Sequence, residues 1–153
     1  GAITLGTLDG ANIEIADLAG RENEVIFGLT ADQVQKLTEE GTYSPWDVYN
    51  SNPRVKNIMD SLFTGPWCQG DQNKFRMIFE EIMNRNDQFY VLADFNAYNK
   101  ACETADKLYQ DRRAWAKSAI INVASSGYFT SDRTIEEYNR DIWRLEKLVG
   151  NKK

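Results

Sequence analysis

Short apolar runs alternate with amphipathic segments at the start of this chain. Residues 2–8 (AITLGTL) are apolar and rich in β-branched side chains on both faces, a pattern typical of a strand covered on both sides in a parallel sheet. Asp9 and Gly10 interrupt this run, and the apolar positions after them predict a helix that Gly20 closes at its C′ position. The chain is therefore predicted to open with a strand, a glycine turn and a helix.

A second strand and a second helix follow directly. Residues 24–28 (EVIFG) form another short apolar run, and residues 30–33 (TADQ) have the Thr-x-x-Gln spacing of a capping box. In such a box the two side chains satisfy backbone amides at the start of a helix, which here ends near Gly41. The first forty residues thus alternate strand, helix, strand and helix, which predicts the α/β class.

The remainder of the chain has a mainly helical pattern. Ser44 before Pro45 and Asn52 before Pro53 each combine an N-cap side chain with a proline at the first helical position. Apolar residues then recur at helical spacing in two segments, which predicts two helices with one apolar face each. These residues are Val55, Ile58, Met59, Leu62 and Phe63 in the first segment and Phe75, Ile78, Phe79, Ile82 and Met83 in the second.

Three further helices are predicted from N-cap residues. Asp94, Asp111 and Ser131 each precede a segment with helical apolar spacing. Residues 89–94 (FYVLAD) fit either a short extended segment or the approach to a helix. The last helix carries Ile135, Tyr138, Ile142 and Trp143 on one face. We therefore expect two short N-terminal strands followed by a helical array, without an internal domain boundary.

Composition narrows the chemistry that this chain can perform. Its 153 residues include no histidine, which removes the usual general base, the His-dependent nucleophile systems and the commonest zinc ligand. The net charge of −5 argues against nucleic acid as a partner. No apolar run is long enough for a membrane span, and no signal peptide is recognisable. Cys68 and Cys102 have no metal-ligand spacing, so free thiols in a reducing cytoplasm are expected.

The glycine turn and its acids are the first candidate site. Gly6 and Gly10 sit where a strand meets a helix, as in loops that cradle phosphate. Their spacing matches neither dinucleotide nor P-loop motifs, which favours a structural turn. Asp9, Glu14 and Asp17 suggest acid/base chemistry. The structural interpretation is that Asp9 caps the helix N-terminus and that Asp17 is a solvated surface acid.

Two other groups of residues have both a functional and a structural interpretation. Ser131, Asp132 and Arg133 follow an aromatic pair at a helix start, where an anion could bind, although an N-cap with a first-turn acid explains the same residue types. The four tryptophans mostly have the helical spacing of core residues, which favours packing over stacking on a base or a sugar. They are Trp46, Trp67, Trp115 and Trp143, and only Trp67 has no core position.

Three stretches together resemble one enzyme family. GAITLGTLDGANIEIADLAG, YVLADFNAYNKACETADKLY and SSGYFTSDRTIEEYNRDIW are similar to consecutive pieces of the C-terminal end of α-glucan phosphorylases. The resemblance implies a parent enzyme that cleaves the terminal α-1,4 bond of a glucan with inorganic phosphate and releases glucose 1-phosphate. It also implies pyridoxal phosphate as the cofactor of the parent, held as a Schiff base by a lysine in a GNMK motif.

The same resemblance places the chemistry outside this chain. In the family the cofactor lysine precedes the segment that matches Gly1, so it is expected upstream, and no catalytic, cofactor-binding or metal-binding residue is assigned here. Lys36, Lys56 and Lys117 look solvated and lack a context that would depress their pKa values for Schiff-base chemistry. We expect residues 1–153 to be the C-terminal part of the second Rossmann-like domain, with no cofactor of its own.

Two functions therefore remain open. In one, the chain is a scaffold segment of a cytoplasmic phosphorylase, inactive alone, whose partner is the remainder of that polypeptide. In the other, it is a stand-alone helical module for protein interaction without catalysis. A strand buried on both faces in the parent would expose apolar surface and backbone groups in the isolated chain. Self-association of the isolated chain is therefore expected.

Overall fold

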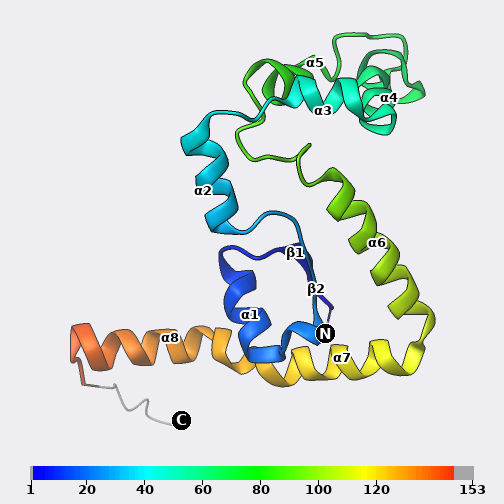
Figure 1. Ribbon diagram of the computed structural model, residues 1–153. Helices are drawn as coiled ribbons and strands as arrows, with labels where there is room; N and C mark the ends of the chain where they lie inside the picture. Colours follow the sequence, from blue (N-terminus) through cyan, green and yellow to red (C-terminus); the bar gives the residue numbers. More distant parts are fainter. Residues whose placement is uncertain (1, 147–153) are drawn as a thin grey trace.

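The computed structural model describes residues 2–146 as a mainly helical chain with two short parallel strands. Figure 1 shows the path of the chain through these elements. In chain order they are β1 (Leu5–Thr7), α1 (Ala11–Ala19), η1 (Arg21–Asn23), β2 (Val25–Phe27), α2 (Ala31–Glu40), α3 (Pro45–Ser51), α4 (Pro53–Thr64), η2 (Pro66–Cys68), α5 (Arg76–Phe79), η3 (Glu80–Asn84), α6 (Phe95–Gln110), α7 (Arg112–Ser125), η4 (Ser126–Phe129), α8 (Ser131–Tyr138) and η5 (Asn139–Trp143).

The first part of the chain forms a βαβ unit. β1 and β2 pair in parallel, with Leu5 opposite Val25 and Thr7 opposite Phe27, and α1 makes the connection between them. The two predicted strands and their parallel pairing are thus confirmed, although β1 covers only three of the seven residues predicted. Just before β1, the backbone amide of Thr4 donates to the Glu24 carboxylate at 2.6 Å rather than to another strand.

The middle of the chain forms a separate helical layer. α2 leads away from the strands to α3, α4 and α5, and α6 returns toward them (Figure 1). The main apolar core lies here, where Val55 and Met59 of α4 pack with Met83 of η3 and Leu92. Both predicted apolar stripes supply residues to this core, because i and i+4 positions share one face of a helix. Other members of each stripe, such as Ile58 and Ile78, are exposed.

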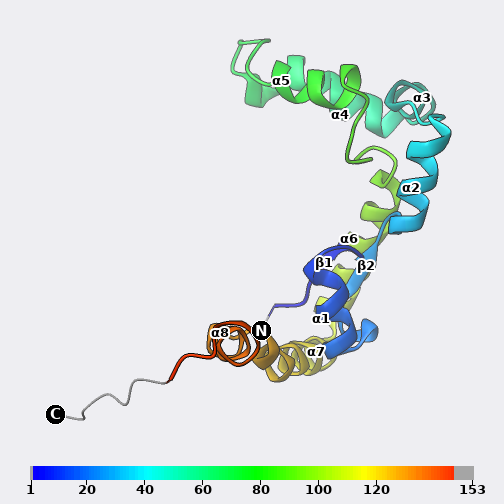
Figure 2. The ribbon, with the colours of Figure 1, turned by 90° about the vertical axis from the view of Figure 1, so that its left-hand side faces the viewer.

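The last helices close the chain below the strands. α7 packs against α1 and η1, and Ser118 of α7 donates to the Asn23 side chain at 2.9 Å in the interior. α8 then continues beyond α7, past the end of α1, as Figure 1 shows, and it is seen nearly end-on in Figure 2. Within residues 2–146, α8 packs chiefly on η4 and η5, its immediate neighbours in sequence.

Most of the predicted helix starts are confirmed. Thr30 and Gln33 form the capping box in both directions, with distances of 3.3 and 2.9 Å. Ser44, Asn52 and Asp111 also accept backbone amides at the starts of their helices. These caps join residues two or three positions apart, so local sequence is sufficient to define them.

Three predicted caps are wrong. The last helix is capped by Thr130, whose hydroxyl accepts the Arg133 amide at 3.4 Å, and Ser131 is its first residue. Asp94 occupies the cap position of α6 but its carboxylate makes no cap bond. α1 likewise has no side-chain cap, since Gly10 stands at the cap position and Asp9 bonds to Thr7. Residues 89–94 form turns rather than a strand.

Many apolar side chains predicted to lie in a core are exposed. Trp46, Trp67 and Trp143 have exposed fractions between 41% and 50%, so the core assignment of Trp46 and Trp143 is wrong for this chain by itself. Helical spacing shows which residues share a face, but it does not supply the element that covers that face. In residues 2–146, Ile135 and Tyr138 of α8 are among these exposed side chains.

Candidate functional site

The glycine turn before α1 uses its own polar groups. The Asn12 side-chain amide donates to the Thr7 carbonyl at 2.8 Å, and the Thr7 hydroxyl donates to the Asp9 carboxylate at 3.0 Å. A Cβ on Gly6 would lie 2.6 Å from the Asn12 side-chain nitrogen, so glycine lets this amide approach the strand. Gly10 has a φ of +49°. These contacts are those of a tightly tied strand-to-helix turn.

The other two candidate acids, Glu14 and Asp17, lie close to η4, which joins α7 to α8. Glu14 and Asp17 of α1 line a cavity of about 240 Å³ together with Tyr128 of η4. Asp9 is not part of this cavity, so the structure separates the three acids that sequence analysis grouped. No base or orienting partner accompanies Glu14 and Asp17 in that lining, which an acid/base pair would require.

A larger cavity lies where the parallel strands end. Thr7 of β1 and Phe27 of β2 line it with Asp94 and residues of α6, and its volume is about 390 Å³. Its walls are largely aromatic. The Asp94 carboxylate accepts a hydrogen bond from the backbone amide of Leu29 at 2.8 Å. This bond holds the segment just after β2 in place. A Cβ on Gly28 would lie 2.5 Å from the second oxygen of that carboxylate.

Lys56 belongs to a three-residue polar cluster on the helical layer. Its ammonium group donates to the Tyr49 hydroxyl at 2.6 Å, and that hydroxyl donates to Asp60 at 2.5 Å. The hydrogen bond to Tyr49, followed by that to Asp60, raises the pKa of Lys56. The same tyrosine and lysine lower the pKa of Asp60. A lysine held in its charged form is not prepared for Schiff-base formation.

A buried carboxylate that sequence analysis did not single out organises the loop after η3. Asp87 accepts hydrogen bonds from the Tyr43 hydroxyl at 2.6 Å and from the backbone amides of Val91 and Leu92. Burial, followed by the hydrogen bond to Asp87, raises the pKa of Tyr43 well above its usual value. Asp87 has a φ of +43°, which its three donors offset. Nothing in the local sequence signals a partner 44 positions away.

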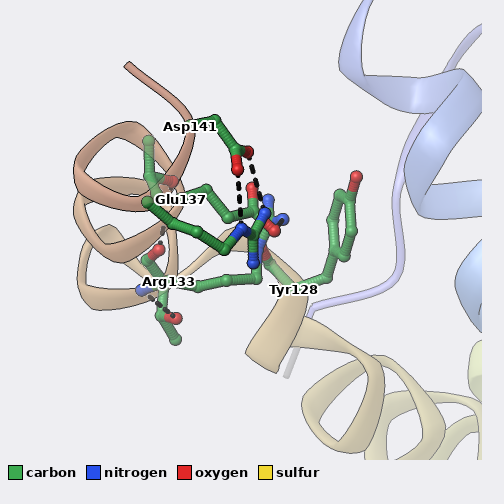
Figure 3. A network of polar contacts seen from close by, with 7 residues as sticks. Tyr128, Arg133, Glu137 and Asp141 are labelled. Atoms are coloured by element: carbon green, nitrogen blue, oxygen red, sulfur yellow. Dashed lines mark hydrogen bonds and ion pairs between the residues drawn. The ribbon is translucent and has the colours of Figure 1, made fainter. Parts of the chain in front are cut away.

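The corner between α7 and α8 is built around Arg133. Figure 3 shows its guanidinium between Tyr128 and Glu137. One nitrogen donates to the Tyr128 carbonyl, another lies 2.7 Å from the Glu137 carboxylate, and the guanidinium carbon lies 3.7 Å from the centre of the Tyr128 ring. The Arg133 guanidinium, which sequence analysis considered as part of an anion site, is therefore already bound by the Tyr128 carbonyl, the Glu137 carboxylate and the Tyr128 ring. Asp132, another residue considered for that anion site, lies in the first turn of α8.

Two classes of site receive no support from the described residues. In residues 2–146, no group of three or more His, Cys, Asp or Glu side chains could hold a metal ion. The helices of that same stretch are all too short or too polar to cross a membrane.

Comparison with known proteins identifies the family. The sequence model of the family described as "Carbohydrate phosphorylase" matches residues 1–145. This chain belongs to the carbohydrate phosphorylase family. The chain is 44% identical to a glycogen phosphorylase of Synechocystis sp. over 97% of its own length, 41% identical to that of Bacillus subtilis over 97%, and 42% identical to the brain form of Pongo abelii over 95%.

The chain spans only a small part of the length of these relatives. It covers 17% of the Synechocystis and Pongo proteins and 18% of the Bacillus protein. The family match includes the glycine turn, the Asp87 loop and the Arg133 corner, and it stops just after η5. All of these features are therefore part of the phosphorylase sequence. The relatives are all glycogen phosphorylases, so the alternative of a stand-alone helical interaction module without catalysis is not favoured.

Proposed function

We propose that this chain is a scaffold segment of an α-glucan phosphorylase. The parent enzyme converts α-1,4-glucan and inorganic phosphate to glucose 1-phosphate, with pyridoxal phosphate as its cofactor. One observation carries the proposal: the family match covers residues 1–145, while the chain spans 17–18% of its glycogen phosphorylase relatives. The names of those relatives support glycogen or a similar glucan as the substrate of the parent, which we place in the cytoplasm.

The proposed place of the chain is the C-terminal part of the second Rossmann-like domain. The β1–α1–β2 unit supports this, because parallel strands joined by a helix are the repeating unit of such domains. A parallel sheet of two three-residue strands is too small to be stable alone. Further strands from the parent would pair with the free edges of this sheet.

The residues present here do not fit a pyridoxal phosphate site. The cofactor needs an amine that can lose its proton, but Lys56 is bound to Tyr49 and Asp60 and its pKa is raised. Lys36 is exposed beside Glu40. The strand-to-helix turn that could cradle a phosphate is tied internally by Asn12 and Asp9. We therefore assign the cofactor, and the chemistry that it supplies, to the part of the parent outside residues 1–153.

The role of the chain in the parent is to support and position that part. Large apolar side chains are exposed on α1, α4, α6, α7 and α8, and such surface is typical of faces that another part of a protein covers. A segment of this kind affects activity by holding other residues in place rather than by contacting substrate.

Segment replacement in a relative tests the proposal. The matching segment of the Bacillus subtilis relative is replaced by residues 1–153, and glucose 1-phosphate release from maltodextrin and phosphate is measured. We expect release by this chimaera and none by the relative from which the segment is deleted. A chimaera that elutes as a folded protein, with the circular dichroism of the parent, but releases no glucose 1-phosphate would overturn the proposal.

A further inference from the structure

A polar cavity lies where α6 meets β2. Its volume is about 420 Å³, and residues of η1, β2 and α6 line it; α6 passes beside the strands (Figure 1). Ala97 and Ala101 of α6 are four positions apart, so they share one face of the helix. Their short side chains leave space next to β2. We call this space the β2–α6 cavity. Its polar side chains are those of Arg21, Glu24, Lys100 and Thr104.

Glu24 has a buried carboxylate that the described residues satisfy only in part. The residue has an exposed fraction of 8%. Its Oε2 atom accepts the backbone amide of Thr4 at 2.6 Å. Its Oε1 atom is the one buried side-chain oxygen or nitrogen in residues 2–146 that has no hydrogen-bond partner. Because a buried acceptor without a donor is unfavourable, Oε1 indicates a donor that the described residues do not supply.

Two cationic side chains in the same cavity have no acidic partner. Arg21 of η1 and Lys100 of α6 both line it, and neither forms an ion pair with another residue of the described range 2–146. Lys36, in contrast, pairs with Glu40 one helical turn away. With Glu24, the lining carries two positive charges and one negative charge, which favours an anion as its ligand.

From this combination we infer that the β2–α6 cavity binds a small phosphate monoester that carries hydroxyl groups. The phosphate oxygens can accept hydrogen bonds from both the Arg21 guanidinium and the Lys100 ammonium, and a ligand hydroxyl donates to Oε1 of Glu24. Lys100 acts here as an ammonium group and forms no Schiff base. The inference does not depend on the proposed function, because it rests on the groups of the cavity itself.

A phosphate monoester fits these groups better than a carboxylate does. One arginine fork satisfies both oxygens of a carboxylate, which would leave Lys100 without a partner, whereas a phosphate has a further oxygen for it. The volume of about 420 Å³ lies in the lower part of the range for small-molecule sites, about 300–1,000 Å³. The Thr104 hydroxyl donates to the Lys100 carbonyl at 2.9 Å, so its oxygen can accept a second ligand hydroxyl.

Protection of Lys100 from acetylation tests binding. An amine-reactive acetylating reagent is applied to the chain and to the Bacillus subtilis chimaera, and peptide mass spectrometry reads each lysine separately. Lys107 is the internal control, because it lies on α6 but outside the cavity. Glycerol 3-phosphate at about ten times its dissociation constant should slow the acetylation of Lys100 about tenfold and leave Lys107 unchanged.

Four further probes separate the parts of the ligand. Glucose 1-phosphate should also protect Lys100, and its midpoint relative to that of glycerol 3-phosphate distinguishes a sugar phosphate from a smaller polyol phosphate. Inorganic phosphate should protect more weakly, since it has no hydroxyl carbon chain to reach Glu24. Glycerol and glucose, which have hydroxyl groups but no phosphate, should not protect.

Glu24→Gln tests the hydroxyl contact separately from the anion contact. The glutamine oxygen still accepts the Thr4 amide, but an NH₂ donor replaces Oε1. This variant should bind glycerol 3-phosphate about tenfold more weakly and inorganic phosphate at least as well as wild type. Arg21→Gln, at an exposed position, should weaken both ligands about tenfold. Glu22→Gln, at the neighbouring exposed acid of η1, is the matched control. Circular dichroism confirms that each variant is folded.

Four results would overturn the inference. Unchanged acetylation of Lys100 with either ester, in folded protein, would show that the cavity does not bind them. Equal protection by inorganic phosphate and the esters, in wild type and in Glu24→Gln, would identify an anion site that does not use Glu24. Protection by glycine but not by the esters would assign a zwitterionic ligand instead. Protection of Lys100 in the chimaera without any ligand would show that another part of the polypeptide fills the cavity.

Discussion

The Asp94 carboxylate holds the backbone amide of Leu29 at 2.8 Å, although 65 positions separate the two residues. The bond fastens the segment just after β2 to the start of α6, which closes the large excursion of the chain through α2–α5. The same carboxylate lies against Gly28, which has a φ of +83°. The left-handed backbone of Gly28 and the Asp94 carboxylate therefore lie next to each other, at the point where the helical layer returns to the strands.

Removal of the Asp94 carboxylate should destabilise the chain. Asp94→Ala leaves the partly buried Leu29 amide without an acceptor, which costs about 1–3 kcal/mol. Asp94→Asn keeps a side-chain oxygen and should lose less. Urea unfolding followed by tryptophan fluorescence measures both, with Asp106→Asn on the exposed side of α6 as the control. Equal unfolding midpoints for Asp94→Ala and wild type would contradict the role given to this bond.

A methyl group at Gly28 should be poorly tolerated. Gly28→Ala places a Cβ 2.5 Å from the Asp94 carboxylate and in a left-handed conformation, so a loss of roughly 1–3 kcal/mol is expected. Gly127→Ala is the matched control, because a Cβ there has no heavy atom within 4 Å. Thermal unfolding of the two variants should separate them clearly. A Gly28→Ala variant as stable as Gly127→Ala would contradict this reasoning.

The cap of α8 gives a pair of adjacent variants with opposite expectations. Thr130→Ala removes the hydroxyl that accepts the Arg133 amide and should cost about 1 kcal/mol. Ser131→Ala changes the first residue of the helix and should alter the free energy of unfolding by less than about 0.5 kcal/mol. Urea unfolding of both variants decides between the two residues. A larger loss for Ser131→Ala would restore serine as the cap.

The Lys56–Tyr49–Asp60 cluster predicts a pH dependence. Hydrogen bonds from Tyr49 and Lys56 lower the pKa of Asp60 below its usual value of about 3.8. A carboxyl group whose pKa is lower in the folded chain stabilises it above the unfolded pKa, and this contribution is lost as pH falls through the folded value. Tyr49→Phe should raise the pKa of Asp60 toward normal. Carbon NMR titration of the Asp60 carboxyl measures the change, and an unaltered titration would exclude Tyr49 as the main cause.

The isolated chain should not hold pyridoxal phosphate at one lysine. Lys56 is kept in its charged form by Tyr49 and Asp60, so an aldehyde should react weakly and without selectivity. Borohydride reduction after incubation with the cofactor, followed by peptide mapping, measures the label at each lysine, including Lys100 in the cavity beside Arg21. We expect scattered labelling well below one per chain. Stoichiometric label at one lysine would contradict the assignment of the cofactor to the rest of the parent.

Local sequence was sufficient for four helix caps whose partners lie within one helical turn. These caps could be predicted because capping depends on residue type and on a spacing of two or three residues. Examples are the capping box of Thr30 and Gln33, and the side chains of Asn52 and Asp111, which accept backbone amides in the first turns of α4 and α7. The two short strands were predictable from their apolar, β-branched runs. The family resemblance also came from contiguous motifs, and the family match confirms it.

Tertiary structure decided the partners that lie far apart in sequence. Asp94 resembles an N-cap in sequence, but the fold brings the Leu29 amide to its carboxylate. Asp87 finds Tyr43 across 44 positions, and no local pattern marks either residue. Thr130 and Ser131 are both good caps by type, and only the backbone of the η4 corner selects the threonine. The apolar row of α8 was readable from its spacing, whereas its exposure was not, because a helix defines its own apolar face and only packing against other elements determines what covers it.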